Sequence, residues 1–560
     1  MRLLYRFSMA LIWLSSSPLM AGYSQEVVVK SEAQLAAFQE EEIGFVAIKN
    51  LGRVQAIFQK YSQKLGLGAE AIFVQAALNG MSTVVDNERP IGIVFDHSKE
   101  KKEYTLVLPV KNKKGCEDLF HSFASLGKAE IQKHEGYETV SIPGYPRPLA
   151  VSITDQWWTI TLNHEALQEV QNIEGLEEHL QKLTEANDVS LWMPIKPLIA
   201  DFENLIPQVL DTNEVIDPRF STGLPPEKLH ELQTLRACVQ WAKPYVLEGE
   251  YLEQGLTFDF EKEQIRYHFH YQPADGSSIE KGLTGKHIKS SQGGFVSNEV
   301  AFFSQWNFEL GEDLINVFQL LCKQLKAQMR GSLETEMPAQ VREMVISLGD
   351  RLLNLIEETA AEKRIYGGVR FEFAGMETTS VVGTGLADGY ELEDIIGTLM
   401  EEGGEYDAIV YDYDWYKGFN IHKIEVPAGD QEDEIAAADF FLAIAEKEAY
   451  LALADERGRL ALRRVLKDAA EREEDLKAAG FIVQINGKHF AGGIYNTFPE
   501  ESSIPSIQQK SEALQKFLTD PKLQEKSDLI QLKVTQEKGA VQGTLIFDEV
   551  NLGWLIPLMK

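Results

Sequence analysis

The same order of secondary-structure signals runs twice through this chain. In the first copy an apolar, strand-like run, Tyr104–Val110, leads through a turn into a helix-like segment near Cys116. In the second copy Thr378–Val382 leads through a glycine-containing turn into the helix-like Glu391–Leu399. Each copy continues with a glycine-led strand that ends at a proline, and then with a strand that leads into a capped helix. A repeat of this size constrains the architecture more than any single residue does.

The repeat predicts an α+β fold that is internally duplicated, with antiparallel sheets and helices packed on one face. In each copy the order is strand–helix, strand–strand–helix, and then three strands and a helix, unlike the regular alternation of a doubly wound sheet. The chain has 560 residues, too many for one core. We place the first half at 23–290 and the second at 291–560. The charged, Leu-rich stretches 311–362 and 456–479 predict helices.

The N-terminus has the pattern of a signal peptide over residues 1–22. Arg2 and Arg6 precede the apolar run Phe7–Leu14, and small residues around Ala21 offer a cleavage site. We therefore expect export, to the periplasm or beyond the cell. The signal peptide is either cleaved or kept as a membrane anchor, and both outcomes stay open. No later run approaches the roughly 20 apolar residues that span a bilayer, so no transmembrane segment is expected after the signal peptide.

Charge and cysteine content exclude some classes of protein. The chain carries 86 Asp and Glu against 54 Lys and Arg, a formal charge of −32, which would repel nucleic acid. The three cysteines, Cys116, Cys238 and Cys322, are far apart in sequence. Buried free thiols are favoured over a single Cys238–Cys322 disulfide.

Two motifs have spacings that are used in cofactor or metal sites. Gly383–Gly389 lies between an apparent strand and a helix, but its spacing is GxGxxxG, and the topology is not a βαβ unit, so we expect a structural turn. His268 and His270 alternate on a strand without a nearby third ligand, so we expect a polar, solvent-facing strand surface. The sequence also lacks GxSxG, HExxH, Walker and SxxK motifs. We predict no cofactor, no metal and no catalytic residues.

The segment Tyr411-Asp412-Tyr413-Asp414-Trp415-Tyr416 is the most distinctive local cluster. Regular alternation would place Asp412 and Asp414 on one face with aromatic rings nearby, a composition that suits an interface or a sugar ring. We predict it as a possible binding surface, against the alternative of aromatic residues near a turn on an edge strand. A further aromatic pair, Trp157 and Trp158, is expected to place one of its members in the core.

Several segments resemble an uncharacterised family of exported bacterial envelope proteins. The resemblance rests on the order of Asn87–Phe95, Tyr104–Val110 and Trp158–Leu167, and on the hairpin Gly255–Tyr267 followed by Ser277–Leu283. It covers most of the chain, implies export and a role in the envelope, and supplies no catalytic or binding residues.

These observations favour a non-enzymatic, exported scaffold or protein-binding protein of the bacterial cell envelope, with an envelope protein or a glycan as its partner. Two alternatives stay open. One is a carrier for an apolar or glycan ligand in a groove between sheet and helices. The other is a carbohydrate-active hydrolase with paired carboxylates, since any two of the 86 acidic residues could converge.

Overall fold

A computed structural model describes most of the chain. The described residues are 43–64, 68–96, 103–144, 147–171, 173–195, 248–277, 293–295, 297, 300–333, 339–374, 377–402, 409–426, 438–453, 456–471, 480–497, 505–521, 526, 528–537 and 540–559. They divide into two compact units, the first within Ser24–Asp201 and Gly249–Gln272 and the second comprising Glu248 and residues within Pro273–Lys560. The predicted signal peptide and the exact domain boundaries stay predictions, because 1–42 and 278–292 lie outside these ranges.

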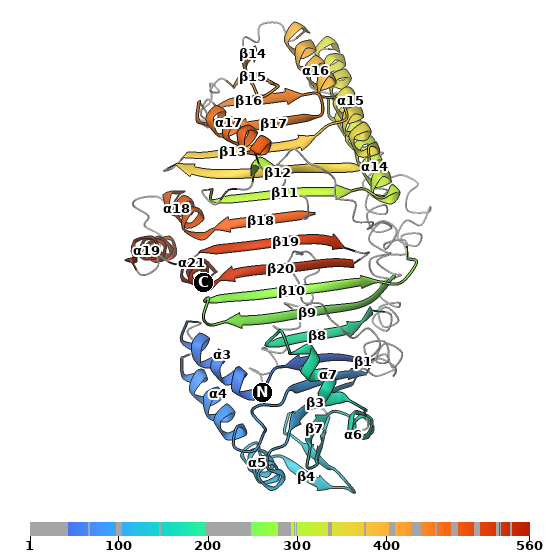
Figure 1. Cartoon of the computed structure of the whole chain (residues 1–560), viewed down its shortest axis with the longest axis vertical. Coiled ribbons are helices and arrows are strands. Elements are labelled where there is room, and N and C mark those ends of the chain that lie inside the picture. Colours follow the sequence, from blue (N-terminus) through green and yellow to red (C-terminus); the bar gives the residue numbers. More distant parts are fainter. Residues whose placement is uncertain are drawn as a thin grey trace. The chain divides into compact units, whose positions relative to one another are not determined.

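The first unit is an antiparallel sheet with helices (Figure 1). Its elements are β1 (Ile43–Ile48), α3 (Leu51–Lys64), α4 (Gly68–Met81), β2 (Ile91–Asp96), β3 (Glu103–Pro109), α5 (Lys113–Leu126), β4 (Glu130–Lys133), β5 (Glu138–Ser141), β6 (Leu149–Ile153), β7 (Trp157–Thr161), α6 (His164–Gln171), α7 (Leu176–Leu183), β8 (Val189–Pro194), β9 (Gly249–Asp259) and β10 (Gln264–Pro273). The strands lie in the order β4-β5-β6-β7-β3-β2-β1-β8-β9-β10.

The second unit contains further helices and strands. They are β11 (Phe302–Glu309), α14 (Glu312–Leu333), α15 (Ala339–Ala361), β12 (Arg364–Ala374), β13 (Glu377–Gly385), α16 (Gly389–Glu402), β14 (Ile409–Tyr416), β15 (Phe419–Val426), β16 (Ala438–Ala445), β17 (Glu448–Leu453), α17 (Glu456–Glu471), β18 (Phe481–Asn486), α18 (Gly487–Thr497), α19 (Pro505–Thr519), β19 (Leu529–Glu537), β20 (Ala540–Asp548) and α21 (Leu552–Met559). Among the described residues no helix is both long enough and apolar enough to cross a bilayer.

The two units have the same strand order. The second sheet runs β14-β15-β16-β17-β13-β12-β11-β18-β19-β20, which is the order of the first sheet with ten added to each strand number. Helices also recur, since a helix pair follows the first strand of each unit and a single helix follows the third. The α+β class, the antiparallel sheets and the internal duplication are therefore confirmed. After the helix that follows the third strand, however, the sequence predicted three strands before the next helix, whereas each unit has four, β4–β7 and β14–β17.

Helices cover both faces of each sheet, whereas the sequence predicted one face. In the first unit Trp158 joins the core with Phe120 of α5, and its neighbour Trp157 joins a separate core with Leu180 of α7. Both tryptophans are buried, although we expected only one in the core. Successive residues of a strand point to opposite faces, so the pair supplies one indole to each core.

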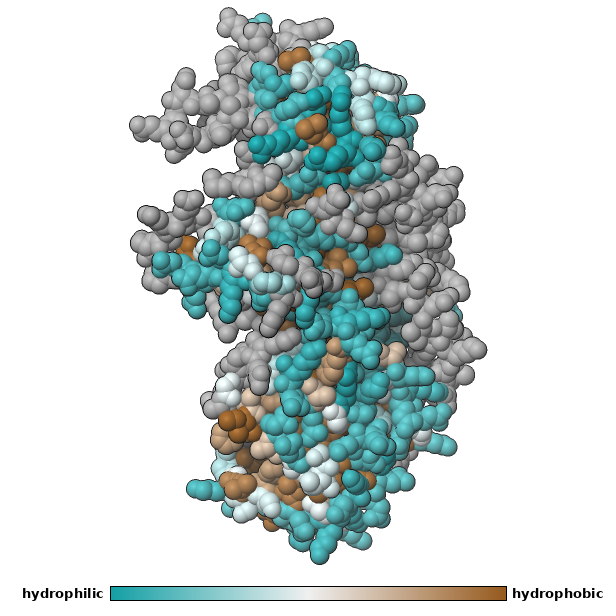
Figure 2. Space-filling view, turned by 60° about the vertical axis from the view of Figure 1, so that its left-hand side comes forward, coloured by the Kyte–Doolittle hydropathy of each residue, from teal (hydrophilic) through white to brown (hydrophobic). Residues whose placement is uncertain are grey.

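The second unit repeats this arrangement. On β16, Phe441 packs in the core that includes Leu462 of α17, while Leu442 packs with Ile396 of α16 on the other face. The surface shown in Figure 2 is mostly hydrophilic, but apolar side chains gather at the lower left of the view. Cys116 and Cys322 are buried free thiols, and Cys238 lies outside the described residues.

The glycines of the predicted GxG turn lie inside β13 instead. A Cβ on Gly383 would lie 2.5 Å from the ring of Tyr450, and a Cβ on Gly385 would lie 2.3 Å from the ring of Tyr366. Both distances are far below van der Waals contact, so these positions have room only for glycine while the rings stay in place. The glycines thus serve close packing within the sheet, which differs from the turn that we expected.

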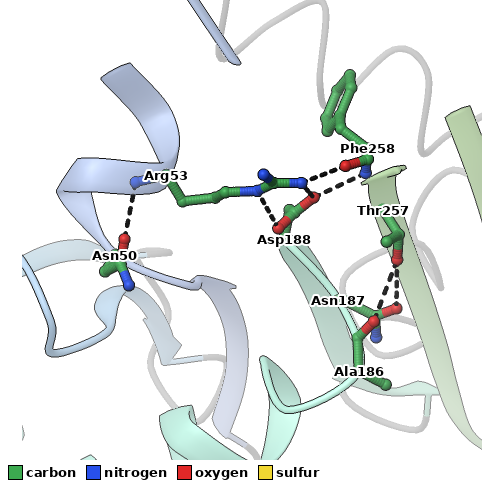
Figure 3. Close-up of polar contacts among 7 residues, drawn as sticks. All are labelled: Asn50, Arg53, Ala186, Asn187, Asp188, Thr257 and Phe258. Carbon is green, nitrogen blue, oxygen red and sulfur yellow. Dashed lines mark hydrogen bonds and ion pairs between the residues drawn. The ribbon is translucent and has the colours of Figure 1, made fainter. Parts of the chain in front are cut away.

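A buried ion pair fastens α3 to the strands of the first unit (Figure 3). The Arg53 Nε donates to Asp188 Oδ1 at 2.7 Å, and its Nη2 donates to Oδ2 at 2.8 Å. The same guanidinium donates to the carbonyl of Phe258, whose own amide donates to Asp188 Oδ2 at 2.7 Å. The Asp188 side chain is 4% exposed. Three segments that are far apart in sequence therefore meet at one carboxylate.

We expect Asp188→Asn to lower the free energy of unfolding of the first unit by about 3 kcal/mol, because it leaves the Arg53 charge without its counter-ion. Glu177→Gln is the matched control. Glu177 also pairs with an arginine, Arg89, but the carboxylate is 39% exposed, so its loss should cost less than about 1 kcal/mol. Urea unfolding measures both values, and equal losses would contradict the role assigned to Asp188.

A second prediction concerns Glu448 at the start of β17. Burial raises the pKa of this carboxyl from 4.5 to about 7, although the Tyr450 hydroxyl donates to it. Because the pKa of Glu448 is higher in the folded state than in the unfolded state, ionisation of this carboxyl favours unfolding. Its contribution to stability is fully present below pH 4.5 and is lost as the pH rises through about 7. Glu448→Gln should therefore stabilise the protein by up to about 3 kcal/mol at pH 8 and have little effect at pH 4. An effect independent of pH in urea unfolding would refute this assignment.

Candidate functional site

The predicted binding surface forms β14, whose partner among the described strands is β15. The register shifts between Val410 and Asp414, and Asp412 has a φ of +49°, in the left-handed region. This irregularity is a β-bulge, which re-aims the side chains around it. The regular alternation that we expected, with both aspartates on one face, is therefore wrong.

Asp414 faces helix α17. Its Oδ2 accepts from Arg459 Nη1 at 3.1 Å and also from the guanidinium of Arg463, while Arg463 lies 5.1 Å over the Tyr416 ring. Burial opposes ionisation of Asp414, but the hydrogen bonds from Arg463 and Arg459 prevail and lower its pKa. Asp414 and Tyr416 thus hold the strand to the helix.

Tyr411 and Trp415 lie with the residues of β15 that face α16. The Tyr411 ring centroid is 4.4 Å from that of His422, which is fully buried. Trp415 is the cross-strand partner of Asn420, and such partners share a face. Tyr411 is 40% exposed and Trp415 is 67% exposed, so both rings are held by the sheet and still reach solvent.

Glu393 of α16 reaches the same part of the sheet. Its Oε1 accepts from Asn420 Nδ2 at 2.7 Å and lies 3.4 Å from His422 Nε2, in a geometry too poor for a hydrogen bond. Asp412, with a side chain 66% exposed, lies nearby, with Oδ1 3.9 Å from His422 Nδ1. We call the side chains of Tyr411, Asp412 and Trp415, together with Glu393, the β14 surface.

The local field at the β14 surface is negative. Burial raises the pKa of the Tyr411 phenol. Three carboxylates raise it further, those of Glu393, Asp412 and Asp394. All the charged groups that shift the pKa of this phenol are therefore anionic. Part of the charge is balanced nearby, because Arg351 pairs with Asp394 at 2.6 Å.

Glu393, Asp412 and His422 are close enough to suggest a metal site, with ligand atoms within 4.8 Å of one another. The tautomer of His422 opposes this. Burial lowers its pKa, which favours the neutral ring, and the Asp412 amide donates to Nδ1 at 3.1 Å. A neutral ring that accepts at Nδ1 carries its proton on Nε2, so neither nitrogen offers a free lone pair, and the group as arranged does not fit a metal.

Tyr413 is the remaining member of the predicted segment. It is 42% exposed, and its ring centroid lies 5.8 Å from that of the buried Phe441. The sequence alone did not predict Glu393, Asn420 or His422 as residues of the site. The only signal for the last two was the polar alternation within an otherwise apolar strand, Asn420-Ile421-His422.

The other candidate histidines differ from expectation. The ring of His270 stacks on Tyr251 at 5.6 Å, and a Cβ on Gly255 would lie 2.0 Å from Cε1 of His268. Burial lowers the pKa of His268 to about 4 and also lowers that of His270. Both imidazoles are thus half-buried against neighbouring residues rather than fully solvent-facing. The absence of zinc at these histidines stays a prediction.

The corresponding hairpin of the first unit is shorter. Its strands β4 and β5 have four residues each, against eight in β14 and β15. The ring of Tyr137 stacks between His134 at 4.7 Å and His164 at 5.5 Å. The two copies thus carry different side chains at the same place in the sheet order.

We expect Asp414→Ala to lower the melting temperature by several degrees, because two arginines lose their shared partner in a partly buried setting. Trp415→Ala, one residue away, should change it by about one degree or less, because exposed side chains add little to stability. Differential scanning calorimetry of both variants tests whether Asp414 anchors the strand while Trp415 is merely exposed. A larger loss for Trp415→Ala would show that the indole is part of the core.

Comparisons with known proteins supply no family. No protein-family model and no curated protein matches the chain. A solved structure, "Structure of crystal form III of TP0453", matches 42% of this chain and 78% of its own at 10% sequence identity, with a TM-score of 0.23. A score this low supports no inference about fold or function.

Proposed function

We propose that this chain is an exported, non-enzymatic protein of the bacterial cell envelope that binds a protein partner through the β14 surface. The observation that carries the proposal is the 67% exposure of Trp415 on a strand held from both faces. Asp414 ties that strand to α17, and the Asp412 amide ties it to His422. Rigid, exposed aromatic side chains supply contact area at little cost in entropy and are enriched at protein interfaces.

The signal-peptide pattern of the sequence supports the exported location. The acidic composition supports a partner other than nucleic acid. A glycan is a second candidate partner, favoured by the same geometry, because an exposed indole beside a carboxylate also suits a sugar ring.

Site-specific photo-crosslinking tests this proposal in the source cells. We expect a photoreactive residue at position 415 to give one dominant crosslinked protein in the exported fraction, because the indole would lie in the contact. The matched control is position 132 on β4, since Gln132 is also exposed on the corresponding strand of the first unit. Equal products at both positions, or none at 415, would contradict binding at the β14 surface, and a product in the cytoplasm would contradict export.

A further inference from the structure

Tyr411 and Trp415 of the β14 surface lie on the face of β15 that Glu393 reaches. The Glu393 side chain is 13% exposed. His422 and Asn420 are two residues apart on β15, so their side chains point to the same face. Their Cα atoms are about 7 Å apart. Tyr411 packs on the first and Trp415 is opposite the second. Glu393 contacts both of these β15 residues. Its Oε1 accepts a hydrogen bond from Asn420 and lies 3.4 Å from His422 Nε2. The carboxylate therefore meets the sheet on the same face as the two rings.

This arrangement is complementary to a cation. Aromatic faces attract cations through their quadrupole, and carboxylates form strong charge-assisted hydrogen bonds with them. Asp412 adds an exposed carboxylate on the same strand, with 66% of its side chain accessible. The described cation nearest in sequence is Lys417, exposed in the turn after β14. Arg351 pairs with Asp394, which leaves Glu393 and Asp412 as the anionic groups of the β14 surface that act on Tyr411.

We propose that the β14 surface binds an arginine side chain on a basic, extended segment of the partner protein. The proposal rests on the proposed function and adds the chemistry of the partner. Arginine fits better than lysine because its planar guanidinium stacks on aromatic rings and pairs with a carboxylate through two donors. The formal charge of −32 would also draw a basic partner toward the protein.

The bulge decides how that segment docks. A partner that added a strand to β14 would need a regular row of backbone donors and acceptors along the edge. The register shift between Val410 and Asp414, with its left-handed residue Asp412, interrupts that row. The partner is therefore recognised by side chains. Its arginine lies across the aromatic rings, and its backbone does not add a strand to the sheet.

The test uses a defined peptide with the full chain. The probe is an acetylated, amidated octapeptide of alternating threonine and arginine, and its control replaces each arginine with citrulline, which has nearly the same shape without the charge. Calorimetric titration at low ionic strength should detect binding of the arginine peptide only. Trp415→Ala and Asp412→Asn should each weaken it about threefold to tenfold. Added salt should weaken it as well.

A matched variant controls for lost aromatic area. Phe73→Ala removes a side chain that is 79% exposed on α4 of the first unit, and it should leave the dissociation constant unchanged. Equal binding of the citrulline peptide, or unchanged binding by both surface variants, would overturn the proposal. Crosslinking at position 415 without arginine-peptide binding would reject the basic partner and leave the proposed function standing. Peptide binding without a crosslinked product would reject only the proposed function.

Discussion

The constraint on which the structure depends is burial of both faces of the antiparallel sheet in each unit. Successive residues of the same strand serve two different cores, as Trp157 and Trp158 do in the first unit and Phe441 and Leu442 do in the second. A shift of one residue in strand register would exchange the two sets. The register of these strands is therefore specified from both faces of the sheet.

Two-sided burial also explains which parts of the fold the sequence could predict. Hairpins and charged helices have local signals, so the hairpin of β9 and β10 and the helix α17 appear near the predicted positions. β16 reads Ala-Asp-Phe-Phe-Leu-Ala-Ile-Ala. Its apolar run, Phe440–Ala445, cannot be distinguished from a buried helix by periodicity. α4 was missed for a related reason, since its apolar residues lie all round the helix and leave no polar face to detect.

The candidate site shows a sharper limit. Composition was enough to select Tyr411–Tyr416, but the division of that segment between two faces depends on a bulge. Alternation gives the wrong answer there, because β14 has two more residues than β15 between the paired positions. Asp414 is consequently an anchor, while Asp412 and Trp415 are exposed. Glu393 comes from another helix and His422 from the next strand, so only the tertiary fold brings them together. The same is true of Arg53 and Asp188, which are 135 residues apart.

The sheet order has a consequence for how the chain is made. The first strand of each unit lies in the interior of its sheet, between its second and eighth strands. β1 pairs through Ile48 with Val189, so 141 residues of chain separate the partners, and β11 pairs through Phe302 with Ile485 across 183 residues. Non-local pairings of this kind form slowly. While the chain emerges from the ribosome, the first strand of each unit has one edge without its partner until the eighth strand is made. An exposed strand edge of this kind is a surface that chaperones cover.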